Sequence, residues 1–122
     1  MIVGIGTDMI EVARIKKACL KERFIERIYT ERERQFCSQY PEKAAGNFAV
    51  KEAVVKVFQT GFSGIEPNEI EVLRQQNGSP YINLYGKAKA KQEELRIQRW
   101  HISITNVKEY AMAFVIGEGE ER

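Results

Sequence analysis

The segment 46–58, GNFAVKEAVVKVF, constrains the fold more than any other part of this chain. From Phe48 to Phe58 its residues are apolar, apart from three charged side chains, Lys51, Glu52 and Lys56. This pattern predicts a long buried helix over residues 43–59. A buried charge is costly unless it is paired or binds a metal, so the carboxylate of Glu52 requires a partner.

The amino-terminal residues 2–8 predict a strand in which Gly4, Gly6 and Asp8 share one face. Two glycines on one face weaken a strand, so we expect another element to pack closely there. Asp8 has two interpretations. It is either the N-cap of a helix predicted over residues 10–18, or a free carboxylate at the end of the strand.

The rest of the chain alternates between helical and extended patterns. Thr30 and Glu33 form a capping box at the start of a helix that runs to about Ser38. Asn77-Gly78 predicts a hairpin with a type I′ turn between strands 69–74 and 81–85. A helix over 87–96 and strands over 99–106 and 111–116 complete the pattern.

These elements predict an α+β fold: a single compact domain over residues 1–117, with a mostly antiparallel sheet packed with helices. Residues 118–122 are expected to be a frayed carboxy-terminal tail. A chain of 122 residues is long enough for one domain with a core of its own.

Composition excludes several functional classes. The net charge is only +2 and the basic residues are interleaved with acidic ones, so we expect no nucleic-acid partner. The longest apolar run, residues 110–116, is too short to cross a bilayer, and the first residues do not resemble a signal peptide. Cys19 and Cys37 do not have metal-ligand spacing, and we expect reduced thiols in a cytoplasmic protein.

Charge is unevenly distributed along the chain. Residues 10–35 carry eight Lys or Arg against five Glu, a net charge of +3. This segment is either a solvated helix face with i,i+4 ion pairs or a docking surface for an acidic partner.

Glu52 likewise has two interpretations. It forms an i,i+4 ion pair with Lys56 at the edge of the helix, or it joins Asp8 in a magnesium site. Two carboxylates and a Mg²⁺ ion that keeps some of its waters form the usual site for a phosphate substrate, and Lys56 would lie one turn away to contact a phosphate oxygen.

Four segments together resemble a known family. They are GIGTDMIEVARI at 4–15, FAVKEAVVKVFQTG at 48–61, NGSPYINLYGKA at 77–88 and HISITN at 101–106. In this order and at these separations they resemble holo-acyl-carrier-protein synthase, the small bacterial family of phosphopantetheinyl transferases. The resemblance extends from Met1 to about Val115.

The resemblance implies a reaction and a catalytic set. Members of the family move 4′-phosphopantetheine from coenzyme A to a serine of an apo acyl carrier protein and release adenosine 3′,5′-bisphosphate. It implies that Asp8 and Glu52 bind Mg²⁺ and that Lys56 lies near the phosphates. The group that takes the serine proton stays open among Glu52, Lys56 and a metal-bound water.

The resemblance also implies partners. Carrier-protein docking would fall to Arg14, Lys21 and Arg23. A homotrimer with active sites between subunits and a role in fatty acid biosynthesis are further expectations. The coenzyme A contacts would be Lys43, Asn47, Lys56, Thr60, Gly61, Asn77, Gly78, Pro80, His101, Ser103, Thr105 and Asn106.

Three positions depart from the family pattern. Asn47 replaces an Arg, Gln59 replaces a Gly, and Asn106 replaces a His. The Arg and the His are thought to contact the 3′-phosphate of coenzyme A, and Asn supplies only a weaker, neutral hydrogen bond. Three interpretations follow: other basic residues such as Lys43 bind this phosphate; coenzyme A binds weakly but still reacts; or the chain is a weakened paralogue that binds an acidic carrier-type protein without transfer.

Overall fold

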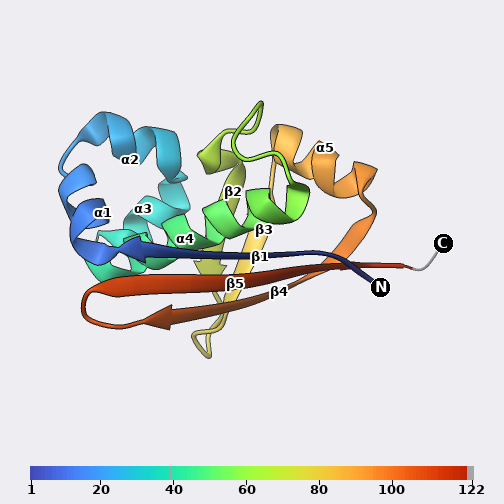
Figure 1. Cartoon of the computed structure of the whole chain (residues 1–122). Coiled ribbons are helices and arrows are strands. Elements are labelled where there is room, and N and C mark those ends of the chain that lie inside the picture. Colours follow the sequence, from blue (N-terminus) through green and yellow to red (C-terminus); the bar gives the residue numbers. More distant parts are fainter. Residues whose placement is uncertain (39, 121–122) are drawn as a thin grey trace.

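The computed structural model describes residues 1–38 and 40–120. The predicted elements occur in the predicted order, with one helix (α2) and one 3₁₀ helix (η1) that were not predicted, and the whole arrangement is visible in Figure 1. In chain order they are β1 (Ile2–Glu11), α1 (Val12–Ala18), α2 (Glu22–Ile28), α3 (Glu31–Cys37), α4 (Pro41–Phe58), the 3₁₀ helix η1 (Pro67–Glu69), β2 (Ile70–Arg74), β3 (Pro80–Leu84), α5 (Gly86–Glu94), β4 (Ile97–Asn106) and β5 (Tyr110–Gly119).

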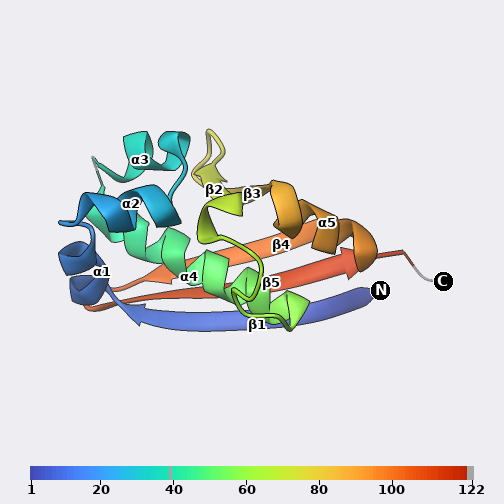
Figure 2. The ribbon, with the colours of Figure 1, turned by 90° about the horizontal axis from the view of Figure 1, so that it is seen from above.

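All strand pairs are antiparallel, which confirms the predicted α+β class. The long strands form a three-stranded sheet in the order β1-β5-β4, and the β2–β3 hairpin forms a separate two-stranded sheet. The helices lie on one side of the three-stranded sheet (Figures 1 and 2). Its other side is not covered by any described element.

Helix α4 is the centre of the domain, because twelve of its eighteen residues are buried. It packs on the glycine face of β1, as the sequence predicted. A Cβ built on Gly6 would be 2.0 Å from the carbonyl oxygen of Ala53, and one built on Gly4 would be 3.0 Å from Val57. The missing side chains therefore let the helix approach the strand closely.

The uncovered side of the sheet, which we call the outer face, carries exposed apolar side chains. Ile5, Met9, Met112 and Phe114 are 43–61% exposed there. Between them lie Thr7, His101, Ser103 and Thr105, which the strand register places in the same rows. Monomeric proteins rarely leave so many apolar side chains together in solvent.

Three local expectations were wrong. Strand β5 continues through Gly119, whose N–H bonds to the Met1 carbonyl, so residues 118 and 119 are not a frayed tail. Residues 121–122 lie outside the described residues. The turn before β3 is not type I′: Asn77 does not have a positive φ, and the Gly78 N–H bonds to the Gln75 carbonyl, which makes Gln76 and Asn77 the central residues. Asp8 is not a helix cap, because β1 continues to Glu11.

The predicted capping box is confirmed, with Thr30 and Glu33 bonding reciprocally at the start of α3. The Trp100 ring packs edge-on against Phe58, and its Nε1 donates to Gln92 Oε1. Among the described residues, no helix has the length and apolar character needed to cross a membrane.

Candidate active site

Asp8 and Glu52 line one cavity of about 400 Å³. Asp8 comes from the helix-facing side of β1, two residues after Gly6. Glu52 comes from α4, one residue before Ala53, which Gly6 contacts. The close approach of strand and helix thus brings together two carboxylates that are 44 positions apart in the sequence.

The negative charge of Asp8 acts on the carboxyl group of Glu52. Burial raises the pKa of Glu52, and the negative charge of Asp8 raises it further, whereas Lys56 and Arg14 lower it. The pKa of Glu52 is raised overall, so Lys56 and Arg14 only partly offset burial and the repulsion from Asp8. A pair of this kind is stabilised by an added cation.

Lys56 is held by β1 rather than by Glu52. Its Nζ donates to the Thr7 carbonyl at 2.8 Å and lies 3.4 Å from Asp8 Oδ1. No Glu52–Lys56 ion pair occurs among the described residues, so the simple i,i+4 interpretation was wrong. The Lys56 side chain is still 52% exposed, which leaves its ammonium accessible to a ligand.

The donor set fits a magnesium ion. Two carboxylates supply hard oxygen ligands, and the described residues contain no cluster of three or more His, Cys, Asp or Glu that could hold a metal. A site with only two protein ligands suits Mg²⁺, which keeps waters and takes further oxygens from a phosphate substrate. Zinc sites normally use three or four nitrogen or sulfur ligands.

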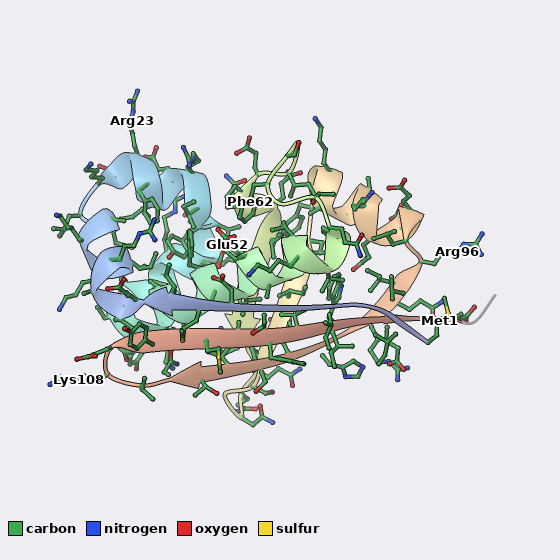
Figure 3. All side chains as sticks on the ribbon, in the orientation of Figure 1. Met1, Arg23, Glu52, Phe62, Arg96 and Lys108 are labelled. Atoms are coloured by element: carbon green, nitrogen blue, oxygen red, sulfur yellow. The ribbon has the colours of Figure 1, made fainter. Side chains whose placement is uncertain are left out.

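A second cavity adjoins the first at Glu52. Glu52, Phe24 and Phe48 line both cavities, and the second extends toward Phe62 and Glu66. Glu52 therefore lies between two adjoining cavities, which we call the groove, and Figure 3 shows it near the middle of the molecule with Phe62 close by. The lining is part charged and part apolar, which suits a long substrate with charged and uncharged parts; the charged residues are Asp8, Arg14, Arg27, Glu52 and Glu66.

The residues expected to dock a carrier protein are not all in one place. Arg14, on α1, lines the same cavity as Asp8 and Glu52. Lys21 is the residue before α2, and Arg23 projects into solvent from the outer end of the helical layer (Figure 3). Of these three residues, only Arg14 lies close to the carboxylates. Lys21 and Arg23 lie farther from them on the surface.

Comparison with known proteins identifies the family. A family model described as the 4′-phosphopantetheinyl transferase superfamily matches residues 4–115. The chain belongs to this superfamily. A holo-[acyl-carrier-protein] synthase from Lachnoclostridium phytofermentans is 58% identical over 118 residues, 97% of each chain. The family resemblance seen in the sequence is therefore confirmed.

Solved structures agree with this assignment. An acyl carrier protein synthase from Plasmodium yoelii with ADP bound has a TM-score of 0.89 and 30% identity, over 99% of this chain and 98% of the other. A holo-(acyl-carrier-protein) synthase from Bacillus anthracis in complex with CoA (3′,5′-ADP) has a TM-score of 0.82 and 36% identity, over 98% and 99%.

This phosphopantetheinyl transferase does not gather all its expected coenzyme A residues into one site. Thr60 and Gly61 follow α4, near Lys56, whereas Asn77, Gly78 and Pro80 lie on the β2–β3 hairpin. His101, Ser103 and Thr105 lie on the outer face of the sheet, and His101 Nε2 is 2.9 Å from Glu118 Oε1. Asn106 alternates to the opposite, helix-facing side.

Asn47 is the one expected coenzyme A residue that the structure does not support as a contact. Its side chain is fully buried. Its Nδ2 donates to Glu33 Oε2 and to the Val72 carbonyl, each at 3.0 Å. An amide enclosed and bonded in this way is not available to a nucleotide, so Asn47 belongs to the core.

Gln59, another departure from the family pattern, adopts the left-handed conformation that ends α4, with φ 61°. Glycine adopts this conformation without a steric penalty, which explains the usual Gly at this position. The helix still ends here, and Thr60 and Gly61 follow at the place that the family pattern predicts.

The partner of Lys51 is not evident from the sequence. Its Nζ is fully buried and lies 2.8 Å from Glu33 Oε1, with further bonds to the Pro67 and Ile70 carbonyls. This ion pair ties α4 to α3 and to the start of β2. A lysine inside an otherwise apolar helix was the available signal, but spacing alone does not identify a carboxylate 18 positions away.

Proposed function

We propose that this protein transfers 4′-phosphopantetheine from coenzyme A to a serine hydroxyl of an apo acyl carrier protein, releasing adenosine 3′,5′-bisphosphate. The observation that carries the proposal is the shared cavity of Asp8 and Glu52, with Lys56 and Arg14 beside it. Family membership and the relatives with coenzyme A or ADP bound support it.

Magnesium is the metal that this donor set fits, and we propose that Asp8 and Glu52 hold it. A bound Mg²⁺ would neutralise pyrophosphate charge and stabilise the leaving phosphate. Phosphoryl transfer depends mainly on alignment and charge neutralisation. Lys56 contributes a further positive charge, because its ammonium is fixed by the Thr7 carbonyl and Asp8 yet remains half exposed.

In this reaction the serine oxygen forms a bond to the phosphorus that carries the pantetheine arm. The bond from that phosphorus to the bridging oxygen of the pyrophosphate breaks, and the electron pair leaves with adenosine 3′,5′-bisphosphate. The serine hydroxyl gives its proton to a general base, for which Glu52 and Lys56 are the candidates that this chain supplies. The groove that extends from Glu52 past Phe24 and Phe48 gives the uncharged pantetheine arm an apolar wall.

The carrier protein would dock on the basic segment 10–35, with Arg14 closest to the reacting groups and Lys21 and Arg23 further out. Carrier proteins of this kind are acidic helical bundles. Complementary charge at the rim of an interface raises the association rate and makes binding sensitive to salt.

We further propose a homotrimer with active sites between subunits, built on the outer face. A neighbouring subunit would bury the exposed apolar side chains of this face, which are Ile5, Met9, Met112 and Phe114. The expected coenzyme A residues His101, Ser103 and Thr105 lie in the same rows of the sheet, so an interface on this face would bring them to a neighbouring subunit. A cytoplasmic location and a role in fatty acid biosynthesis complete the proposal.

The alternative, a paralogue that binds a carrier protein without transfer, is weaker. A protein that only binds does not require two carboxylates in one cavity, and this chain has them.

The test is intact-mass measurement of an apo acyl carrier protein after incubation with this protein, coenzyme A and Mg²⁺. Phosphopantetheine transfer adds about 340 Da to the carrier, and the metal requirement predicts no gain when EDTA is present. No gain with any of several carrier proteins, from a folded sample, would overturn the proposal. An equal gain in EDTA would overturn the metal site alone.

A further inference from the structure

Arg74, the last residue of β2, is a half-buried cation without an anionic partner. Its guanidinium makes no hydrogen bond or ion pair with any other residue that the structure describes, and its Nη1 is buried without a partner. Burial lowers the pKa of Arg74, and the nearby Cys37 and Glu33 only partly counter this. A guanidinium that has lost water without gaining a partner is costly.

A second cation lies beside the same aromatic ring. The Arg74 guanidinium is 5.3 Å from the centroid of the Phe36 ring, and Lys43 Nζ is 4.8 Å from that centroid. No carboxylate of the described residues is within ion-pair distance of either one. Contact with an aromatic face offsets only part of the cost of holding two positive charges together, so this group of residues favours an added anion.

The surroundings of Arg74 include residues from three other elements, α4, β3 and β4. Gly46 on α4 has no side chain, and a Cβ built there would be 3.6 Å from Asn106 Oδ1 and 3.9 Å from Arg74 Nη2. Pro80 pairs directly with Arg74 across the hairpin. Lys43, Pro80 and Asn106 are three of the residues expected to contact coenzyme A, and Arg74 lies among them.

Coenzyme A carries two separate phosphate groups, the pyrophosphate and the 3′-phosphate. The Asp8–Glu52 site accounts for the pyrophosphate only. Arg is the preferred side chain for bidentate binding of a phosphate, and the chain lacks the family Arg and His because Asn47 and Asn106 replace them.

We propose that Arg74, together with Lys43, binds the 3′-phosphate of coenzyme A and thereby replaces those two missing cations. This inference rests on the proposed transferase function.

The experiment compares the affinity for coenzyme A with that for 3′-dephospho-coenzyme A by calorimetry, for the wild type and four variants. Arg74→Gln is expected to weaken coenzyme A binding by about ten- to a hundredfold, the range for a lost hydrogen-bonded charge. It should change the affinity for 3′-dephospho-coenzyme A by no more than about twofold, because that ligand lacks the 3′-phosphate. Lys43→Gln should do the same to a lesser extent, and Arg74→Lys should recover part of the loss.

Arg96→Gln is the matched control, because Arg96 is exposed at the end of α5, away from this site (Figure 3). It should bind both ligands as the wild type does. Equal losses for the two ligands in Arg74→Gln, or no loss for either, would overturn the inference. If Arg74→Gln does not fold, Lys43→Gln and Arg74→Lys test the inference instead. A loss of affinity for coenzyme A but not for 3′-dephospho-coenzyme A supports it, and equal losses or no loss overturn it. A folded wild type that binds neither ligand and transfers nothing would instead overturn the proposed function.

Discussion

Gly6 of β1 lies directly against the backbone of Ala53 on α4, so closely that a Cβ on Gly6 would be 2.0 Å from the Ala53 carbonyl oxygen. No side chain fits in that space. Asp8 follows Gly6 on the same face of the strand, and Glu52 immediately precedes Ala53. The closeness of strand and helix at this one point therefore sets the separation of the two carboxylates.

Gly6→Ala should consequently damage both stability and activity. The added methyl group pushes β1 away from α4, and such overpacking costs about 1–3 kcal/mol or more when backbone must move. We expect a loss of that size in urea unfolding and a loss of transfer in the fraction that stays folded. Gly4→Ala is the control, because its Cβ would meet Val57 at 3.0 Å and requires a smaller adjustment. Equal stability and normal activity in the two variants would contradict this account.

The buried Lys51–Glu33 pair should be a major determinant of stability. Lys51→Met leaves the Glu33 carboxylate buried without its cation, which typically costs about 3–5 kcal/mol. The double variant Lys51→Met/Glu33→Leu removes both charges and should recover much of that free energy of unfolding. Lys91→Met, which breaks the surface pair with Glu94, should cost less than about 1 kcal/mol. If the double variant is no more stable than Lys51→Met alone, the Lys51–Glu33 ion pair does not determine the free energy of unfolding.

These two relationships show how far the sequence could predict the site. The alternation of Gly4, Gly6 and Asp8 correctly predicted a close neighbour on their face, because strand periodicity is local. The identity of the partner for Lys51 was not predictable, because Glu33 meets it only through the packing of α3 on α4. Asn47 was misjudged for the same reason: its position in the family motif indicated a ligand contact, whereas the fold buries it against Glu33.

Arg14→Ala should weaken carrier-protein docking more than catalysis. Arg14 is exposed on α1 and lines the cavity of the carboxylates. We expect the KM for the carrier protein to rise by about five- to tenfold at low salt, with a smaller effect at high salt where surface charges are screened. The KM for coenzyme A should not change. Lys89→Ala, on α5, is the control, and an unchanged carrier KM in Arg14→Ala at low salt would remove Arg14 from the docking surface.

The outer face of the sheet should hold the subunits together. Phe114 is 45% exposed in the middle strand of that face. Phe114→Glu would place a charge within the proposed apolar interface, so sedimentation should show monomers for this variant and trimers for the wild type. Leu20→Glu, at another exposed apolar position on the opposite side of the molecule, should remain trimeric. A monomeric wild type, or a trimeric Phe114→Glu, would contradict the proposed assembly.

The central claim is that Asp8 and Glu52 together hold the magnesium ion on which transfer depends. The most direct measurement is the single-turnover rate of carrier-protein modification, followed by intact mass over a range of Mg²⁺ concentrations, for Glu52→Gln, Asp8→Asn and the surface control Glu94→Gln. Loss of metal-dependent charge stabilisation predicts rates at least about a hundredfold below wild type for the first two. Wild-type rates and melting temperatures are expected for the control. Transfer at the wild-type rate by folded Glu52→Gln would contradict the metal site and, with it, the proposed mechanism.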